Sequence, residues 1–534
     1  MKGIAVVASP AVFAALLALS GATTAATAAP APGACAAVQG RVVDVRDFGA
    51  RGDGSTDDSQ AISSASACAA SLFKADAAGR AGVTLYFPRG SYGVARQIRI
   101  DADQSPLFGG GIQIVGDGAD ASRIVATTGA GIFAVTMSKP PSRAAVGLDV
   151  RDLGMVAGIA DAGTALDVEA EGWSTAEARE YARHLVGLRL RHVDFSASGA
   201  SRAYFAYGVR ATGLYLAFLG DVQMRGAGGV ACYAFSYSYG TMVDHSTCEG
   251  PRVGVDLINA SEGDVVTNSQ FRNVAIAIRM RVVPGEVPGP SNDGAVIVGN
   301  TISAQITGID LTWKRFVFID RNDLQASGRG SFDGVVLANE GPSYVTGNVI
   351  TGADGTGNGI RLTNDAASRA GLTSAITISR NTFARIGTAV SIGSGVRDTI
   401  LRSNVFDRKV TPPTIAGWAR SCFPHRGIAT RCHKHRLLTT RIADDKRCVR
   451  RRPIEKAQGH FDRSAGMHGS RRLHAHEMIA SRREADGSAG GDGDAIHIHH
   501  ARYTARLFRS VKHQHAAGRR TRARQRDRIR AGVV

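Results

Sequence analysis

Beyond its first 29 residues the sequence has no apolar run long enough to cross a bilayer, so we expect no stable membrane anchor in the rest of the chain. Residues 1–410 also lack net charge. Of the 64 Lys and Arg residues 28 lie in residues 411–534, as do 10 of the 46 Asp and Glu residues, which leaves 36 of each sign in the main body. Nucleic-acid binding needs a basic excess, so we predict no nucleic-acid partner for the main domain.

Residues 296–406 lack any helical spacing of apolar residues and instead repeat one phrase five times. Each copy is an alternating apolar run, then Asn, one further residue, and an Ile, Leu or Phe. A second short strand follows most copies, as in GIDL at Gly308 and GIRL at Gly359. The repeated residues are Asn300, Asn322, Asn348, Asn381 and Asn404, at intervals of 22, 26, 33 and 23 residues. A period of about 20 to 50 residues without helices predicts an all-β solenoid, a β-helix whose coils bury a core by stacking.

The five Asn residues are predicted to be structural. Asn tolerates the left-handed conformation of a tight bend, and its amide can hydrogen-bond to the coils above and below. Between about Leu148 and Leu257 the coils are less regular, and Ser246 and Ser269 fall where Asn stands later. Glu169–His184 interrupts them and reads as a small surface helix.

Residues 1–29 are predicted to be an export signal. Lys2 supplies a positive end, Ile4–Leu19 an apolar run, and Ala26-Thr27-Ala28 a small-residue cleavage site. We therefore expect a periplasmic or extracellular protein, with a β-helix domain over residues 30–410 whose capping segment spans about 42–80. Outside the cytoplasm an even number of Cys residues suggests disulfides. The simplest of three pairings is Cys35–Cys68 and Cys232–Cys248, and four buried thiols are the alternative.

Residues 411–534 form a basic tail that holds 12 of the 15 His residues and shows no hydrophobic period, so we predict that it is largely disordered. Three interpretations remain open. The tail is a basic interaction arm, a metal-binding tract at His497–His500, or the product of a shifted reading frame.

The start of the main body predicts a cap for the solenoid. Val42–Ile62 reads as a short strand, a Gly-rich turn and the start of a helix, which Thr56 or Asp57 would cap and which would run to about Ala78. Val83–Tyr92 reads as strand, turn and strand, and Gly111–Gly118 as a further strand and turn. A helix in this place would cover the open end of the solenoid.

The phrases DFGARGDGSTDDSQAI, LYFPRGSY and IQIVGDG in this region resemble the opening of the pectate-lyase-like superfamily of right-handed parallel β-helices. Polygalacturonases, rhamnogalacturonases, related lyases and phage tailspike-type proteins belong to it. The resemblance implies that fold from Val42 to about Phe406, with a polysaccharide as partner. It implies a Ca²⁺ ion if the protein is a lyase, and a trimer if it is like the tailspikes. The acids of the opening, Asp47, Asp53, Asp57 and Asp58, are interpreted as turn and cap residues.

In this superfamily the second strand of each repeat forms the first sheet, whose outer face carries the chemistry. Alternation predicts that the residues between inward apolar ones point out. These are Asp256, Ala277, Asp310, Val336, Arg361 and Ser391. We predict catalytic roles for Asp310, Asp333, Arg361 and Asp256, with Asn358 beside them as a substrate-binding residue. Clustered carboxylates suit acid–base cleavage of a glycosidic bond, and Asp with Arg suits a lyase.

Aromatic residues concentrate in residues 204–239, where they either line a sugar-binding surface or stack inside the coils. We include Tyr233 and Tyr237 as substrate-binding candidates on the first interpretation. His245 is a third candidate because it lies in an acid-rich patch with Asp244 and Glu249.

The motifs of polygalacturonases are only partly present. Ser331-Phe332-Asp333-Gly334 keeps the Asp-Gly of their Asn-Thr-Asp-Gly motif, no paired acids stand near Gln305, and Gly387–Ser394 lacks the expected His. The sequence therefore predicts an exported enzyme that cleaves an acidic, uronate-containing polysaccharide by lysis or hydrolysis. The alternative is a non-catalytic glycan-binding, adhesin-like or tailspike-like β-helix.

Overall fold

The structure, a computed structural model, describes residues 34–38, 40–75, 82–102, 111–137, 146–170, 186–199, 202–214, 216–259, 263–282, 293–364, 373–411, 413–415, 420–421 and 433–434. The predicted export signal and almost all of the predicted tail lie outside these residues. So does most of the predicted surface helix at Glu169–His184, of which only Glu169 and Ala170 are described, as the end of a strand. No helix in the described part of the chain is long and apolar enough to cross a membrane.

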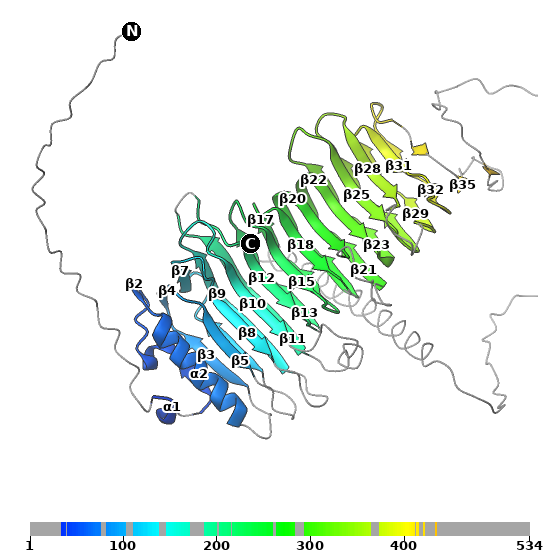
Figure 1. The fold of residues 1–534 in the computed structure, drawn as a ribbon. Helices are drawn as coiled ribbons and strands as arrows, with labels where there is room; N and C mark the ends of the chain where they lie inside the picture. Colours follow the sequence, from blue (N-terminus) through cyan, green and yellow to red (C-terminus); the bar gives the residue numbers. More distant parts are fainter. Residues whose placement is uncertain are drawn as a thin grey trace, which may run out of the picture. The chain divides into compact units, whose positions relative to one another are not determined.

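The chain forms a right-handed parallel β-helix, in which a 34-stranded ladder folds into three sheets (Figure 1). Each coil contributes one strand to the second sheet, one to the third and one to the first, in that order along the chain. The first sheet contains β5 (Ile98–Ala102), β8 (Phe133–Met137), β10 (Thr164–Ala170), β12 (Tyr207–Thr212), β15 (Ala231–Ser236), β18 (Val253–Ile258), the second halves of β20 (Gln270–Arg281) and β22 (Thr301–Thr312), β25 (Phe332–Ala338), β28 (Gly357–Thr363), β31 (Thr388–Ile392) and β34 (Thr414–Ile415).

The other two sheets follow the same stacking. The second sheet contains β1 (Val42–Asp44), β3 (Val83–Phe87), β6 (Ile112–Gly116), the first halves of β9 (Val146–Ala157) and β11 (Val186–Ala197), β13 (Ala217–Gly220), β16 (Met242–Asp244), β19 (Asp264–Thr267), β21 (Asp293–Val298), β23 (Arg315–Asp320), β26 (Ser343–Thr346), β29 (Ile376–Ser379) and β32 (Ile400–Arg402). The third contains β2 (Asp53–Asp57), β4 (Gly90–Val94), β7 (Ser122–Ala126), the second halves of β9 and β11, β14 (Gln223–Arg225), β17 (Thr247–Glu249), the first halves of β20 and β22, β24 (Asp323–Ala326), β27 (Val349–Thr351), β30 (Thr382–Ala384) and β33 (Val405–Phe406). A separate antiparallel pair joins β35 (Arg420–Ser421) to β36 (His433–Lys434).

The N-terminal end of the stack is covered by the predicted cap. Besides the short α1 (Ala34–Ala37) and the 3₁₀ helix η1 (Val45–Phe48), it holds α2 (Ser59–Ala75), which packs on β1, β3, β5 and β6. Ile62 and Phe73 of α2 are buried against the first coils. The helix begins later than predicted, because Thr56 belongs to β2, but the Asp57 carboxylate does accept a hydrogen bond from the Ser59 N–H at 3.0 Å.

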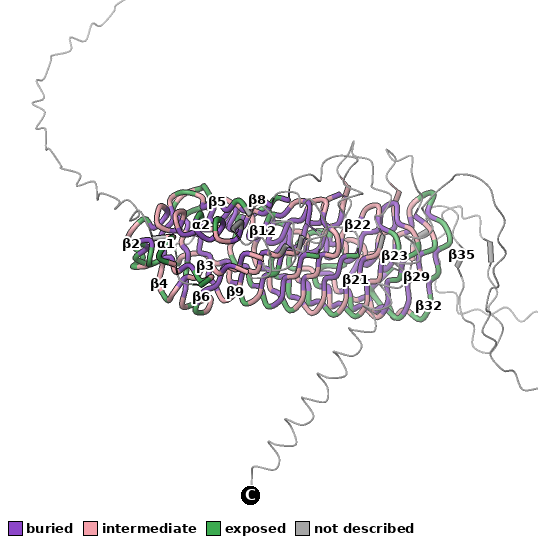
Figure 2. The backbone as a smooth tube through the Cα atoms, turned by 90° about the horizontal axis from the view of Figure 1, so that it is seen from below, coloured by how far each residue is buried: buried purple, intermediate pink, exposed green. Residues whose placement is uncertain are grey.

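The interior of the coils is filled by aliphatic side chains and a few aromatic rings. Buried, intermediate and exposed residues alternate along the stacked coils (Figure 2). Both predicted disulfides are present. Cys35–Cys68 joins α1 to α2, and Cys232–Cys248 joins β15 of the first sheet to β17 of the third. The cross-links therefore stabilise the cap and one coil of the less regular region.

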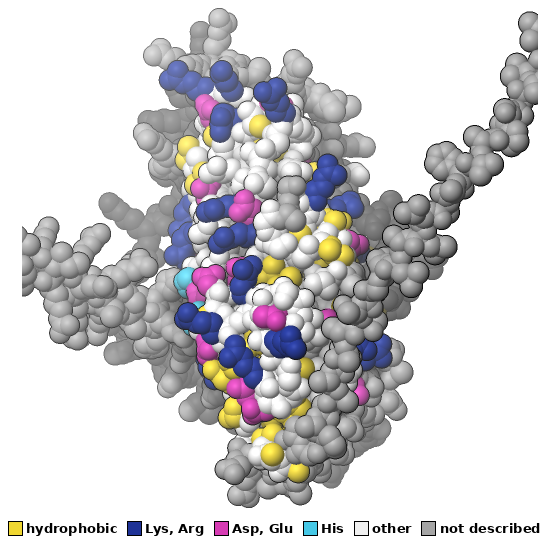
Figure 3. Space-filling model, turned by 90° about the vertical axis from the view of Figure 1, so that its left-hand side faces the viewer, with side chains coloured by type: hydrophobic (Ala, Val, Ile, Leu, Met, Phe, Trp, Pro, Cys, Tyr) yellow, Lys and Arg dark blue, Asp and Glu magenta, His cyan; other side chains and the backbone are white. Residues whose placement is uncertain are grey.

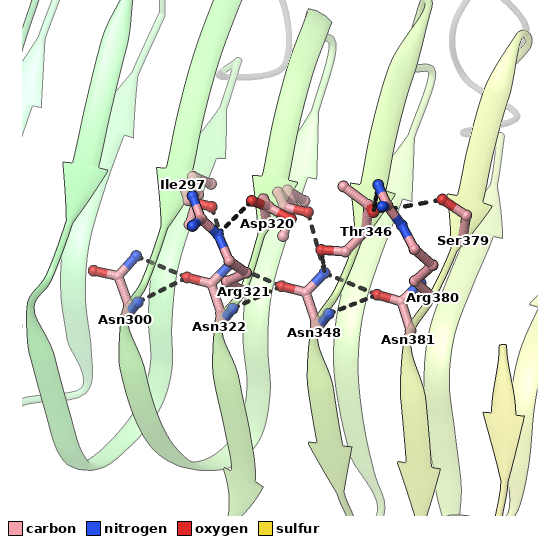
Figure 4. A network of polar contacts seen from close by, with 11 residues as sticks. Ile297, Asn300, Asp320, Arg321, Asn322, Thr346, Asn348, Ser379, Arg380 and Asn381 are labelled. Atoms are coloured by element: carbon pink, nitrogen blue, oxygen red, sulfur yellow. Dashed lines mark hydrogen bonds and ion pairs between the residues drawn. The ribbon is translucent and has the colours of Figure 1, made fainter. Parts of the chain in front are cut away.

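The predicted Asn ladder is confirmed (Figure 4). In each step the side-chain carbonyl of one Asn accepts hydrogen bonds from the backbone N–H and the side-chain amide of the Asn one coil earlier, as between Asn348 and Asn322, at 2.9 Å each. Ser269 and Ser246 continue the ladder towards the N-terminus, as predicted. One detail of the prediction was wrong: the left-handed residue is the one before each Asn, for example Arg321 with φ 53°.

A buried ion pair lies where the first sheet turns into the second. The Lys314 ammonium lies 3.1 Å from the Asp264 carboxylate, and both side chains are almost fully buried. The Lys314 backbone N–H donates to Glu340 Oε1 at 3.0 Å. Burial raises the pKa of the Glu340 carboxyl well above its usual range, which favours the neutral form of that side chain.

Candidate functional site

One column of stacked side chains, with one residue from each coil, runs along the outer face of the first sheet. Register places Asp256 beside Arg279, Arg279 beside Asp310, Asp310 beside Val336, and Val336 beside Arg361. Three of the predicted catalytic residues therefore share one column. Towards the N-terminus the column continues through Ala234, Arg210, Asp167, Ala134 and Arg99, and after Arg361 it includes Ser391.

Glycines near the start of these strands set which residues face outward. A Cβ on Gly334 would lie 2.5 Å from the Ile350 side chain, and one on Gly359 would lie 2.3 Å from the Phe383 ring. Side chains of the third sheet thus fill the space beneath these positions. The glycine faces the core, and the side chain two residues later faces out.

Asp256 is held by two guanidinium groups. Arg279 donates Nε to Oδ1 at 3.0 Å and Nη2 to Oδ2 at 2.7 Å, and Arg281 adds two contacts of 3.4 Å each. The Asp256 side chain is only 6% exposed. A carboxylate that is buried and paired in this way positions its arginines, and little of its own surface remains for a ligand.

Asp333 is the second paired carboxylate on this face. Its Oδ1 accepts hydrogen bonds from the Asn358 backbone N–H at 3.1 Å and the Asn358 side-chain amide at 2.8 Å. Its Oδ2 accepts one from Arg361 Nε at 2.8 Å. The structure therefore brings together three of the residues predicted from the sequence.

Asp310 lies between these two groups and differs from both. Among the described residues, no side chain donates a hydrogen bond to its carboxyl group. Burial raises its pKa above the ordinary value, Arg279 and Arg361 act in the opposite direction, and Asp333 and Asp256 raise it further. A half-buried carboxyl with a raised pKa, close to two arginines, is suited to proton transfer.

Arg279 was missed by the sequence prediction, which placed Ala277 on the outer face instead. Ala277 is fully buried, because it occupies the core-facing position that glycine holds in neighbouring strands. Aligning Ala277 with Gly254 and Gly308 identifies Arg279 as the outward residue, so the sequence did contain the signal. Strict alternation failed here because the strand has an extra inward-facing residue at the glycine position.

The remaining candidates lie away from this column. Tyr233 is fully buried, and its hydroxyl lies 3.1 Å from Thr247 O and 3.2 Å from Val222 O, so it is a core residue and offers no binding surface. Tyr237 is half-buried in the turn after β15, with φ 50°. His245 lies in the turn between β16 and β17, where its Nδ1 is 2.8 Å from Asp244 Oδ2. None of the three residues stands in the outward column of Asp256 and Asp310.

The acidic residues of this face do not fit the Ca²⁺ ion that a lyase of this type would use. Within the described ranges no group of three or more His, Cys, Asp or Glu side chains is placed to hold a metal ion. Two of the three carboxylates are already bound by arginines, and guanidinium groups beside the third disfavour a cation. We therefore assign no metal to this site.

Residues 42–154 match the family model described as rhamnogalacturonase A/epimerase, pectate lyase-like. This match covers the capping segment and the first coils, and the remaining coils continue the same three sheets. Residues 42–154 are pectate-lyase-like, and the described coils form a parallel β-helix. No curated protein gives a significant match to its sequence.

The solved structures that are similar to this parallel β-helix include an epimerase module, an exopolygalacturonase and a tailspike protein. The A-module of the Azotobacter vinelandii mannuronan C-5 epimerase AlgE4 is 15% identical, with 70% of this chain and 100% of that chain covered and a TM-score of 0.43. The Yersinia enterocolitica family 28 exopolygalacturonase is 14% identical, with 72% and 78% covered and a TM-score of 0.39. The Dettilon tailspike protein is 14% identical, with 70% and 68% covered and a TM-score of 0.38.

Proposed function

We propose that this protein binds an acidic polysaccharide on the outer face of the first sheet and cleaves it by hydrolysis. The observation that carries the proposal is Asp310, a carboxyl group with a raised pKa and no hydrogen-bond donor among the described side chains, close to Arg279 and Arg361. Arginine binds carboxylates well, which supports an acidic substrate.

The two carboxyl groups have different environments, as an acid and a base require. Asp310 would donate its proton to the glycosidic oxygen as the bond to the anomeric carbon breaks. Asp333, ion-paired with Arg361, would take a proton from the water that attacks that carbon, giving a new reducing end and a free hydroxyl group. Asp310 and Asp333 lie on adjacent strands and three residues apart along the strand direction, which puts their backbones about 11 Å apart. The two carboxyl groups are therefore on separate positions of the face, as a mechanism with a water between acid and base requires.

The test is to incubate the full chain with a panel of acidic polysaccharides and to analyse the products. Hydrolysis gives new reducing ends without unsaturated sugars, whereas elimination gives ultraviolet-absorbing unsaturated ends. Asp310→Asn should lower the hydrolytic rate by about 10²- to 10⁴-fold. Ser391→Ala, in the same column, should leave it unchanged. Unsaturated products, or full activity of Asp310→Asn, would contradict the proposed mechanism.

A binding protein without catalysis is the second candidate. It is favoured by the pairing of Asp256 and Asp333 with arginines, which gives a stable surface without any bond cleavage. It also fits the incomplete polygalacturonase motifs. Retention of a polysaccharide with no product of either kind, at any pH tested, would support this candidate over the enzyme.

We also propose that the protein is exported, as its first 29 residues suggest. The two disulfides support this, because such bonds persist in oxidising compartments and are rare in the cytosol. Fractionation of cells that express the full chain, together with mass determination of the mature N-terminus, would test it. Retention in the cytoplasm with an intact N-terminus would contradict it.

A further inference from the structure

Pairs of Asp and Arg side chains recur along the first sheet with a period of three coils. The first pair is Asp167 with Arg210, in neighbouring strands β10 and β12. The second is Asp256 with Arg279, in β18 and β20, and the third is Asp333 with Arg361, in β25 and β28. Three strand spacings separate each arginine from the next, which is about 14 Å at the usual distance between strands.

The three arginines occupy the same outward column, although the sheet does not require a charge there. Ala134, Ala234, Val336 and Ser391 stand at equivalent positions in other coils. The pairs of Arg210 and Arg361 are partly exposed, and such an ion pair adds little stability, typically about 0 to 1 kcal/mol. The pair of Asp256 and Arg279 is largely buried, and a buried ion pair is often no more stabilising than apolar residues of similar size. Stability of the sheet therefore gives no reason for arginines at this interval. Figure 3 shows basic and acidic side chains interleaved on one face of the molecule.

Each arginine is oriented by its carboxylate and keeps part of its guanidinium group available. Arg210 donates Nε and Nη2 to Asp167 and lies 5.8 Å from the centre of the Tyr207 ring. Arg279 uses the same two nitrogens on Asp256, and Arg361 uses only Nε on Asp333. No described residue takes the Nη1 hydrogens of any of the three. The side chains are 51%, 20% and 44% exposed in that order.

We infer that Arg210, Arg279 and Arg361 are three carboxylate subsites for one polysaccharide chain that lies parallel to the axis of the β-helix. The inference rests on the proposed function and adds to it the spacing of charges in the ligand. Carboxylates of the bound polysaccharide must recur about every 14 Å along the polysaccharide chain. The spacing between successive carboxylates is then either about 14 Å or a shorter distance of which about 14 Å is a whole multiple. A chain that contacts all three arginines spans about 29 Å of the sheet.

The subsite at Arg210 allows a test away from the reacting groups, because four strand spacings, about 19 Å, separate it from Asp310. Arg210→Gln should raise KM for the polysaccharide about tenfold and leave kcat unchanged, since one charge-assisted hydrogen-bond pair is lost. For the shortest oligosaccharides that are still cleaved, which cannot reach Arg210, KM should not change. Arg225→Gln is the matched control, because Arg225 is exposed on the third sheet.

The outcomes separate the two proposals. If Arg210→Gln affects KM no more than Arg225→Gln while Asp310→Asn abolishes cleavage, the subsites are wrong and the catalytic proposal stands. If the wild type cleaves nothing, affinity of the full chain for uronate polymers is measured directly by calorimetry. An affinity about tenfold lower for Arg210→Gln than for the wild type then supports the subsites in a protein without catalysis. Equal affinities of the two proteins, or no binding by the wild type, overturn the subsites. Melting temperature, expected to be unchanged in both variants, excludes unfolding as the cause.

Discussion

At the scale of single residues, the protonation of Asp310 depends on its neighbours. Burial raises its pKa, and Arg279 counteracts part of that shift. Arg279→Gln removes the positive charge, so the pKa of Asp310 should rise further. If Asp310 is the proton donor, the enzyme loses activity as pH rises through the pKa of Asp310. The alkaline limb of the pH profile of kcat/KM should therefore move to higher pH in the variant.

Arg225→Gln is again the control for that pH profile, and its alkaline limb should coincide with that of the wild type. If the acidic limb moves to higher pH in Arg279→Gln and the alkaline limb does not move, Asp310 acts as a base, because a base loses activity as pH falls through its pKa. If neither limb moves, the protonation of Asp310 does not control the rate.

The sequence predicted three residues of the outward column, Asp256, Asp310 and Arg361, because strict alternation holds where the flanking residues are large and apolar. The same rule failed at Ala277, where a small residue replaces glycine and faces the core. Tyr233 could not be placed from composition alone, because strands favour aromatic residues on either face.

At the scale of elements, the Asn ladder joins the turns between the second and third sheets (Figure 4). Asn348 is fully buried, and its side-chain amide donates to Asn381 Oδ1 at 2.9 Å and to Ile319 O at 3.1 Å. Asn348→Ala removes the acceptor of the buried Asn322 backbone N–H and takes one donor from the Ile319 carbonyl. We expect a loss of about 3 kcal/mol in the free energy of unfolding, measured by urea denaturation.

Asn404→Ala provides the comparison at the C-terminal end of the ladder. Asn404 is only partly buried, so water can replace its hydrogen bonds and the loss should be smaller. Equal losses for the two variants would contradict an account based on burial, and no loss for Asn348→Ala would mean that the ladder adds nothing to stability.

The repeat predicted the three sheets and the ladder because each is a local pattern that recurs. Contacts between unlike residues of different coils leave no such pattern. Lys314 and Asp264 are 50 residues apart in sequence, and only the stacking of coils brings them together. The left-handed turn residue also escaped prediction, since Gly299, Arg321 and Gly347 share no side-chain chemistry that marks the position.

At the scale of the whole β-helix, the ends of the stack of coils are where copies of the protein can pair with one another. Every strand inside the ladder has neighbours on both sides, whereas the first coil has one free edge, which α2 covers. The prediction of a cap followed from this general requirement and from the order of strand and helix patterns in residues 42–92. Its consequence for the intact molecule can be measured by substituting one of the large buried side chains with which the helix packs on the coils.

Phe73 is one of these side chains, 3% exposed and packed in the core of the first coils. Phe73→Asp buries an unpaired charge and should release α2, which exposes apolar surface and strand edges that pair with other copies. We expect light scattering after gel filtration to show self-association at temperatures where the wild type keeps its size. Ala67→Asp, on the exposed side of the same helix, should behave like the wild type. If both variants self-associate, the added charge on α2 is the cause. If neither variant self-associates, the cap does not protect the edge of the first coil.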